Sequence, residues 1–212
     1  MNDPWSERAE LYRTSAAHSS GADLDLIVEW AGGCGTAVDV ATGGGHVARR
    51  LRETGIEVVT CDSAPGMQPD VVCFAEELPF ADSCFDLAVT RVAAHHFSDV
   101  AESTLELARV ASRRVVVVDN LFGGEAAQRA EKLRDPSHVR NYTEAEWRAF
   151  FADAELTIEE LRVIDFPVEL EPWLERTGCT GEDAELVREL LADRTLDGFI
   201  SFARIALLGR VG

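Results

Sequence analysis

The sequence predicts an α/β protein in which short buried strands alternate with helices to form a doubly wound sheet. The segment from Val38 to Ala48 has the pattern of a β-branched strand that ends on a glycine turn and continues directly into a helix. A continuous valine run between Arg113 and Asp119 is typical of a parallel strand that is buried on both faces. Strand and helix patterns alternate along most of the chain, and this alternation indicates a parallel sheet with crossover helices.

The individual elements follow from hydrophobic periodicity and from Gly and Pro breaks. We expect helices over 5–17, 23–30, 45–53, 100–111, 124–134, 143–154, 169–176 and 181–193. We expect strands over 36–41, 56–61, 70–74, 85–90, 113–119, 156–168 and 199–208, with 63–69 as a loop. The 212 residues fit one domain over 1–212, in which 1–30 forms an N-terminal helical lid and 124–142 a lid insertion beside the sheet.

Composition narrows the classes of partner. The formal net charge of −18 disfavours nucleic acid and anionic membranes, since an acidic surface repels both. The N-terminus has no secretory leader pattern, and no apolar run reaches transmembrane length. The five cysteines are an odd number with no close pair, so neither a disulfide framework nor a metal site is indicated. We therefore expect a cytoplasmic protein without a metal.

The glycine turn is the first candidate site. Three glycines, Gly43 to Gly45, precede a helix that opens at His46, and a helix N-terminus attracts anionic groups. The pattern Gly43-x-Gly45-x-x-Ala48 satisfies the dinucleotide fingerprint, and Asp62 follows at the spacing of a ribose-binding acid. Asp39, however, lies where a pyrophosphate would have to fit, so its charge favours a ligand with a cationic end such as S-adenosylmethionine (SAM).

The residues that an oxidoreductase of this type would need are also missing. Lys132 is the only lysine of the chain, and neither Tyr12 nor Tyr142 has a lysine four residues later. The Gly-Lys-Ser/Thr pattern of a phosphate-binding loop is absent too.

Taken together, several short motifs resemble the class I SAM-dependent methyltransferases of the type 11 group, which include the ubiquinone/menaquinone C-methyltransferase relatives. They are Asp39-Val-Ala-Thr-Gly-Gly-Gly, Asp62, Leu78-Pro79-Phe80, Ser83 to Val89, His95-His96-Phe97, the N-terminal Tyr12 to Leu24 and the later Asp135 to Thr143. The resemblance implies a Rossmann-like, seven-stranded, mostly parallel sheet with an antiparallel last strand, helices on both faces and a small helical lid. It also implies SAM as the cofactor.

The resemblance assigns the cofactor site by position. The implied cofactor-binding residues are Tyr12, His18, Asp39, Ala41, Gly43, Gly45, Asp62, Ser63, Met67, Ala75, Glu76 and Arg91. Asp39 and the glycine turn would hold the methionine end, Asp62 the ribose hydroxyls, and Ala75 with Glu76 would lie beside the adenine. Arg91 would lie under the methionine moiety through its backbone. Phe74 stands where the family usually has an acid, and 63–69 is shortened, so Met67 and Phe74 could form apolar walls instead.

Histidines are the candidates for proton transfer. His18 and His138 come from the two predicted lid segments and His95 follows the fourth strand, so each could act as a base or fill a structural role. His138, Arg140 and Tyr142 could bind an anionic acceptor, although a salt bridge at Arg140 fits the sequence equally well.

We therefore predict a SAM-dependent methyltransferase that transfers a methyl group to an O, N or C nucleophile of a small-molecule acceptor and releases S-adenosylhomocysteine (SAH). The alternatives are a NAD(P)-binding oxidoreductase and a SAM-binding protein without catalysis. The expected partner is a small molecule, with no nucleic acid or membrane, and the expected state is a monomer or homodimer. The acceptor itself does not follow from the sequence.

Overall fold

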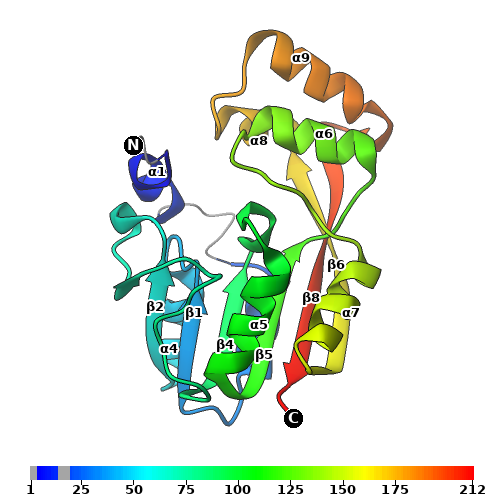
Figure 1. The fold of residues 1–212 in the computed structure, drawn as a ribbon. Coiled ribbons are helices and arrows are strands. Elements are labelled where there is room, and N and C mark those ends of the chain that lie inside the picture. Colours follow the sequence, from blue (N-terminus) through cyan, green and yellow to red (C-terminus); the bar gives the residue numbers. More distant parts are fainter. Residues whose placement is uncertain (1–3, 14–19) are drawn as a thin grey trace.

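The computed structural model describes residues 4–13 and 20–212, which form a sheet with helices on both faces and a small cap at one end (Figure 1). The helices are α1 (Pro4–Arg13), α3 (Ala22–Trp30), α4 (His46–Glu53), α5 (Val100–Val110), α6 (Glu125–Arg134), α7 (Glu144–Asp153), α8 (Leu170–Glu175) and α9 (Gly181–Leu190). The strands are β1 (Thr36–Val40), β2 (Glu57–Asp62), β3 (Val71–Val72), β4 (Phe85–Arg91), β5 (Ala111–Asn120), β6 (Thr157–Glu169), β7 (Thr195–Leu196) and β8 (Phe199–Arg210).

The sheet confirms the predicted α/β class. Its strand order is β3-β2-β1-β4-β5-β8-β6, with parallel pairing from β3 to β5 and antiparallel pairing of β8 with both β5 and β6. The prediction of seven strands misses the two-residue β7, which pairs with the start of β8. Asp197 and Gly198 connect the two strands with positive φ angles of 51° and 83°, as a tight hairpin requires.

The valine run of β5 is buried on both faces. Val115 and Val117 pack with α5 and α7 in one hydrophobic cluster, whereas Val116 and Val118 pack with α3 and α4 in another. Because side chains alternate along a strand, only a run without polar residues can serve two cores at once. The sheet is therefore covered on both faces, as the sequence predicts.

The cap consists of α6, α8 and α9 together with the outer ends of β6 and β8 (Figure 1). Its apolar cluster has Trp173 and Leu174 of α8, Val187 of α9 and Ile200 of β8 among its buried members. The predicted lid segment 124–142 contributes Ala127 and Ala130 of α6 to the same cluster. This segment is thus one part of a cap to which residues some forty positions later also belong.

Other elements differ from the prediction at their ends. The third strand covers two residues rather than 70–74, because the Asp70 carboxylate accepts hydrogen bonds from the backbone N–H and hydroxyl of Thr60 on β2. The loop 63–69 contains a 3-10 turn over Pro65–Met67. Helix α9 ends at Leu190, and a second 3-10 turn covers Ala192–Arg194.

Helix α1 packs against the 3-10 turn that follows β2. The Ser6 hydroxyl accepts a hydrogen bond from the Gly66 N–H at 2.7 Å, and Arg13 donates to the Gly66 carbonyl at 3.1 Å. A Cβ atom on Gly66 would lie 2.5 Å from Ser6, so the close approach of the two backbones requires glycine here. The turn thereby anchors α1 beside the carboxyl ends of the strands.

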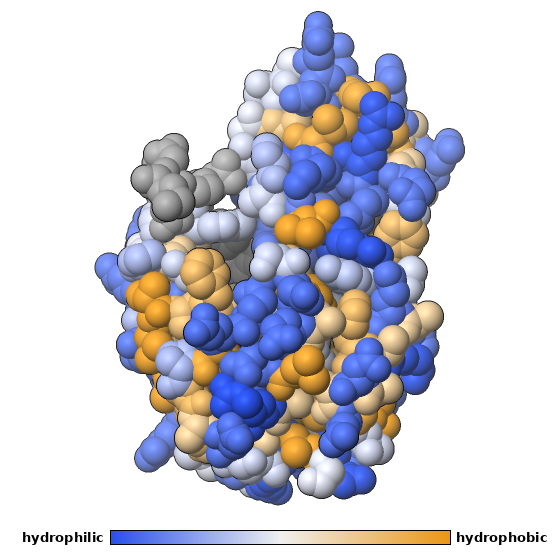
Figure 2. All heavy atoms as spheres, viewed as in Figure 1, coloured by the Kyte–Doolittle hydropathy of each residue, from blue (hydrophilic) through white to orange (hydrophobic). Residues whose placement is uncertain are grey.

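On the face shown in Figure 2, apolar residues lie among polar ones rather than gathering over a single element. None of the helices in the described part of the chain has the length and apolarity needed to cross a membrane.

Candidate active site

The glycine turn connects β1 to α4 with unusual backbone angles. Ala41, Gly43 and Gly45 have φ angles of 56°, 51° and 72°, and Gly45 is the residue that caps α4. A Cβ atom on Gly43 or Gly45 would meet nothing within 4 Å. These glycines are therefore required by the left-handed backbone and not by crowding, and the space above the turn is open.

Asp39 and Asp62 hold this turn from two adjacent strands. Oδ2 of the buried Asp39 accepts hydrogen bonds from the Thr42 hydroxyl at 2.6 Å and from the Ala48 N–H at 3.1 Å. Burial raises the pKa of Asp39 to about 6, although these two hydrogen bonds oppose the shift. Asp62 accepts from the Gly43 N–H and from the Ala64 N–H, both at 2.9 Å.

Above these residues lies a cavity of about 460 Å³, within the range of small-molecule sites. Its lining comes from the carboxyl ends of the parallel strands, from α1 and from the cap. The predicted site residues that line it are Asp39, Ala41, Gly43, Asp62, Ser63, Met67, Ala75, Glu76, Arg91, His95 and His138. Phe74 lies at the wall and is 67% exposed, while Glu76 accepts hydrogen bonds from the Ser98 N–H and hydroxyl.

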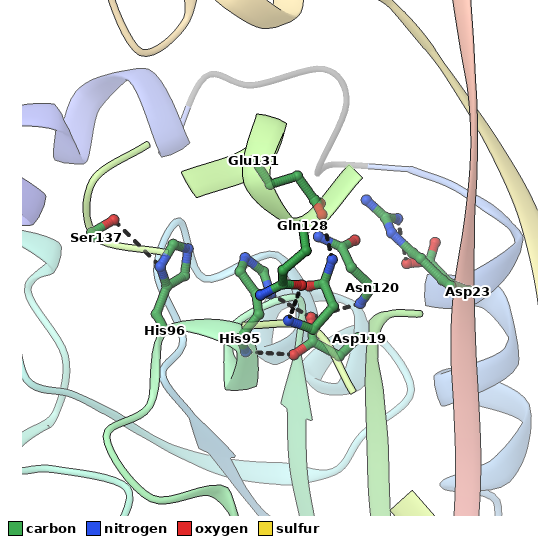
Figure 3. Close-up of polar contacts among 10 residues, drawn as sticks. Asp23, His95, His96, Asp119, Asn120, Gln128, Glu131 and Ser137 are labelled. Carbon is green, nitrogen blue, oxygen red and sulfur yellow. Dashed lines mark hydrogen bonds and ion pairs between the residues drawn. The ribbon is translucent and has the colours of Figure 1, made fainter. Parts of the chain in front are cut away.

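His95 forms the second polar centre of the cavity, together with Asp119 at the end of β5 (Figure 3). Its Nδ1 lies 2.6 Å from Oδ1 of Asp119, and its backbone N–H donates to Oδ2 of the same carboxylate at 2.7 Å. Burial disfavours the charged imidazolium, but the Asp119 carboxylate outweighs that cost and raises the pKa of His95 above its ordinary value. Nε2 makes no hydrogen bond among the described residues, and it is the ring atom left for a ligand.

The loop that contains His138 holds His95 from the cap side. The N–H groups of Val139 and Arg140 donate to the His95 carbonyl at 2.8 and 3.3 Å, and the rings of His95 and His138 are 5.3 Å apart. Burial and the nearby His95 lower the pKa of His138 to about 3, and its buried Nε2 has no partner among the described residues. His138 is therefore a neutral ring at physiological pH and a weak base.

A buried ion cluster lies beside the methionine end of the predicted cofactor site. Nε and Nη2 of Arg91 donate to Asp23 at 2.8 and 3.1 Å, and Nη1 of Arg204 donates to the same carboxylate at 2.7 Å. All three residues are at most 9% exposed. Asp23 lies to the right of the His95–Asp119 pair in Figure 3, where one of its guanidinium contacts is drawn.

The structure does not bring every predicted residue to the cavity. Arg140 stacks on the Tyr142 ring at 4.6 Å and pairs with Glu146, while Tyr142 is buried against Trp147 and Phe150. Neither Arg140 nor Tyr142 lines the cavity, and we leave both out of the substrate pocket. Gly45 shapes the turn without lining the cavity. His18 and the side chain of Tyr12 lie outside the described residues.

Sequence reasoning missed the charged residues that surround the cavity on the cap side. Those that line it are Glu131, Arg134, Asp135, Arg176 and Arg204, and Asp119 pairs with the lining residue His95. Asp119 could have been found, because an acid at the carboxyl end of a buried parallel strand lies at the edge where α/β sheets bind ligands. The arginines could not be predicted, since they come from separate elements, α6, the residue after α8, and β8, that only the folded chain brings together.

Comparisons with known proteins show the family of the chain. A family model described as a methyltransferase domain matches residues 38–118, which run from β1 to β5. The uncharacterized methyltransferase YcgJ of Bacillus subtilis (strain 168) is 32% identical over 204 residues, covering 84% of this chain and 80% of that protein.

Solved structures show the same fold. The crystal structure of Bacillus subtilis YcgJ matches with a TM-score of 0.81 at 24% identity, over 89% of this chain and 97% of that one. The geranyl diphosphate C-methyltransferase of Streptomyces coelicolor A3(2), solved with Mg²⁺, geranyl diphosphate and SAH, matches with a TM-score of 0.65 at 14% identity, over 100% of both chains.

These matches define the class of the protein as a class I SAM-dependent methyltransferase. The chain belongs to the methyltransferase domain family of the type 11 group, as its motifs predict. Membership of this family removes the oxidoreductase alternative.

Proposed function

We propose that this protein binds SAM in the glycine-turn half of the cavity and methylates a small-molecule acceptor in the cap half, with His95 as the general base. The observation that carries this proposal is His95, which lines the same cavity as the turn and whose Nδ1 lies 2.6 Å from Oδ1 of the buried Asp119. A polar pair with a raised histidine pKa in a ligand-sized cavity is the usual mark of a proton-transfer site.

The turn residues fit SAM. Oδ2 of Asp39 takes both of its hydrogen bonds, so Oδ1 is left to face a cationic ammonium or sulfonium group. Asp62 accepts from the Gly43 and Ala64 N–H groups, and because a carboxylate oxygen can accept more than one hydrogen bond, it could also accept from the ribose hydroxyls. Met67 and Phe74 would flank the adenine, as the shortened loop suggests. When bound, SAM supplies a methyl group that its sulfonium already activates.

His95 would remove the acceptor's proton as a general base. Asp119 accepts a hydrogen bond at Nδ1, which fixes the tautomer that leaves Nε2 as the basic nitrogen. The same carboxylate stabilises the imidazolium that forms when Nε2 takes a proton from an O–H, N–H or C–H acceptor. His138 would serve as an uncharged neighbour of this base, because its lowered pKa keeps it neutral.

The size of the cavity and its position under the cap favour a small acceptor over a macromolecule. The charge of −18 argues in the same direction, since nucleic acid would be repelled. Whether the enzyme acts as a monomer or a homodimer stays a prediction from the sequence.

Two measurements test the proposal. Calorimetric titration with SAM, SAH and NAD should show binding of the first two and none of NAD. Incubation with SAM and a panel of small phenols, amines, carboxylic acids and carbon acids should release SAH with at least one of them. A protein that binds SAM but releases no SAH with any acceptor would favour the noncatalytic alternative, and a protein that ignores SAM would contradict the assignment of the turn.

A further inference from the structure

We propose that the acceptor carries an anionic group, a carboxylate or a phosphate, and that Arg204 binds it with help from Arg134 and Arg176 of the cap. This inference rests on the proposed function, because it concerns the cap half of the same cavity. The three arginines come from β8, from the end of α6 and from the residue after α8, and all three line the cavity.

Arg204 is the strongest observation. It is 3% exposed, and the carboxylate that it contacts, Asp23, also accepts hydrogen bonds from Nε and Nη2 of Arg91. Arg204 therefore shares its carboxylate partner with a second guanidinium instead of having one to itself. Nε of Arg204 is itself buried without a hydrogen-bond partner among the described residues. A buried donor without a partner is costly, and a bound anion would relieve this deficit.

Aromatic rings hold two of these guanidinium groups without neutralising them. Arg204 lies over the Phe166 ring at 3.5 Å, and Arg134 lies over the Trp173 ring at 4.3 Å. A guanidinium that stacks on a ring keeps its N–H donors in its own plane, where they can reach a carboxylate or phosphate. Phe166 and Trp173 also give the wall an apolar surface beside the charges, which suits an acceptor with an apolar body.

Two acids on the same side of the cavity accept hydrogen bonds from neighbouring polar groups, and both also interact with the charge of Arg134. Glu131 accepts a hydrogen bond from the Asn141 side-chain amide at 2.5 Å, and burial raises its pKa. Asp135 accepts from the N–H and the hydroxyl of Ser137. Burial also lowers the pKa of Arg204 to about 10, which leaves it charged at neutral pH. An acceptor would thus place its anion among the arginines and its reacting atom near His95.

The test uses the whole protein saturated with SAH and three probes of similar shape: benzoate, phenyl phosphate and the neutral benzamide. Wild-type protein should bind at least one of the two anions about tenfold or more tightly than benzamide, since hydrogen bonds to charged groups exceed neutral ones by this order. Arg204→Gln should remove that preference while leaving SAH affinity unchanged. Arg176→Gln, at a half-buried position, should weaken anion binding without disturbing the packing of the core.

Arg188→Gln is the matched control, because it removes the same charge from the exposed face of α9, where Arg188 pairs with Glu171. It should behave as the wild type, and thermal denaturation should show that each variant is folded. Equal binding of benzoate, phenyl phosphate and benzamide would overturn the inference, as would a loss of SAH affinity in Arg204→Gln, which would assign the guanidinium to the cofactor. Failure of the wild type to bind SAH would instead contradict the proposed function itself.

Discussion

The two halves of the cavity are built in different ways. The glycine-turn half uses backbone groups and acids from β1, β2 and the residues just after them, all between 39 and 76. The cap half uses side chains from segments between residues 95 and 204, which share no local motif. A cofactor that is common to a family can be held by a short motif, whereas the contacts to an acceptor can be assembled from anywhere in the chain. The four predictions below separate these halves, from the largest expected effect to the smallest.

His95→Asn, in the cap half, should abolish most of the methyltransferase activity. Loss of a positioned general base typically lowers kcat by about 10²–10⁴-fold, and SAH affinity should not change. His96→Asn is the control, because burial and the adjacent His95 lower the pKa of His96 to about 3, and it should lose less than about tenfold. Initial rates of SAH release measure both variants, and equal losses would contradict the assignment of His95.

Leu174→Ala should weaken the cap more than the sheet. Leu174 is 1% exposed in the cap cluster, and large-to-small changes at such sites cost about 2–5 kcal/mol of unfolding free energy. Leu87→Ala, at a fully buried position in the sheet, is the matched variant and should destabilise the parallel strands to a similar extent. Hydrogen exchange should show faster opening of α8 and α9 only for Leu174→Ala. Uniform opening in both would mean that cap and sheet unfold together.

Asp62→Ala should weaken SAH binding by about 10–100-fold, because hydrogen bonds to a charged acceptor contribute about 1.5–3 kcal/mol. The Gly43 and Ala64 N–H groups would also lose their acceptor, so the turn itself would loosen. Asp82→Ala removes an exposed acid that pairs with Arg109 outside the cavity and serves as the control. Calorimetric titration with SAH measures the affinity of both variants, and unchanged affinity in Asp62→Ala would mean that other residues bind the ribose.

SAH binding should also depend on the ionisation of Asp39. The pKa of this carboxyl is raised to about 6 in the ligand-free protein, and the ammonium group of SAH favours the ionised form. Affinity should therefore fall as the pH drops below 6, by at most about tenfold per pH unit. Comparing calorimetry at pH 5 and pH 7 measures this effect. Asp39→Asn should flatten the profile, and an equally steep profile in that variant would assign the titration to another group.

Sequence reasoning succeeded where the signal was local. The alternation of strands and helices and the valine run of β5 determined the sheet, because a strand buried on both faces cannot tolerate polar residues. The glycine turn with Asp39 and Asp62 was found because these residues lie at fixed spacings on adjacent strands. The two-residue β7 was missed, since such a short strand exists only through its pairing with β8.

Most residues on the acceptor side of the cavity could not be predicted from the sequence. Arg140 and Tyr142 are residue types that can bind an anion. In the structure, however, Arg140 pairs with Glu146 and Tyr142 packs against Trp147, both on α7. Arg204 and Asp23, by contrast, are 181 positions apart and meet only because β8 returns to the centre of the sheet beside β5. Periodicity carries no information about a contact of that kind.

The pairing of β6 with β8 has a consequence for selectivity. The two strands stay in register from Thr157 and Arg210 in the sheet to Glu169 and Phe199 in the cap, with one irregularity near Ile158, at the sheet end. A continuous antiparallel ribbon resists bending within its plane, so the cap is fixed to the sheet along two strands rather than joined to it by a flexible linker. If His95 is the base and the cap arginines bind the acceptor as proposed, this attachment would limit changes in the span between them, and the enzyme would select acceptors by length.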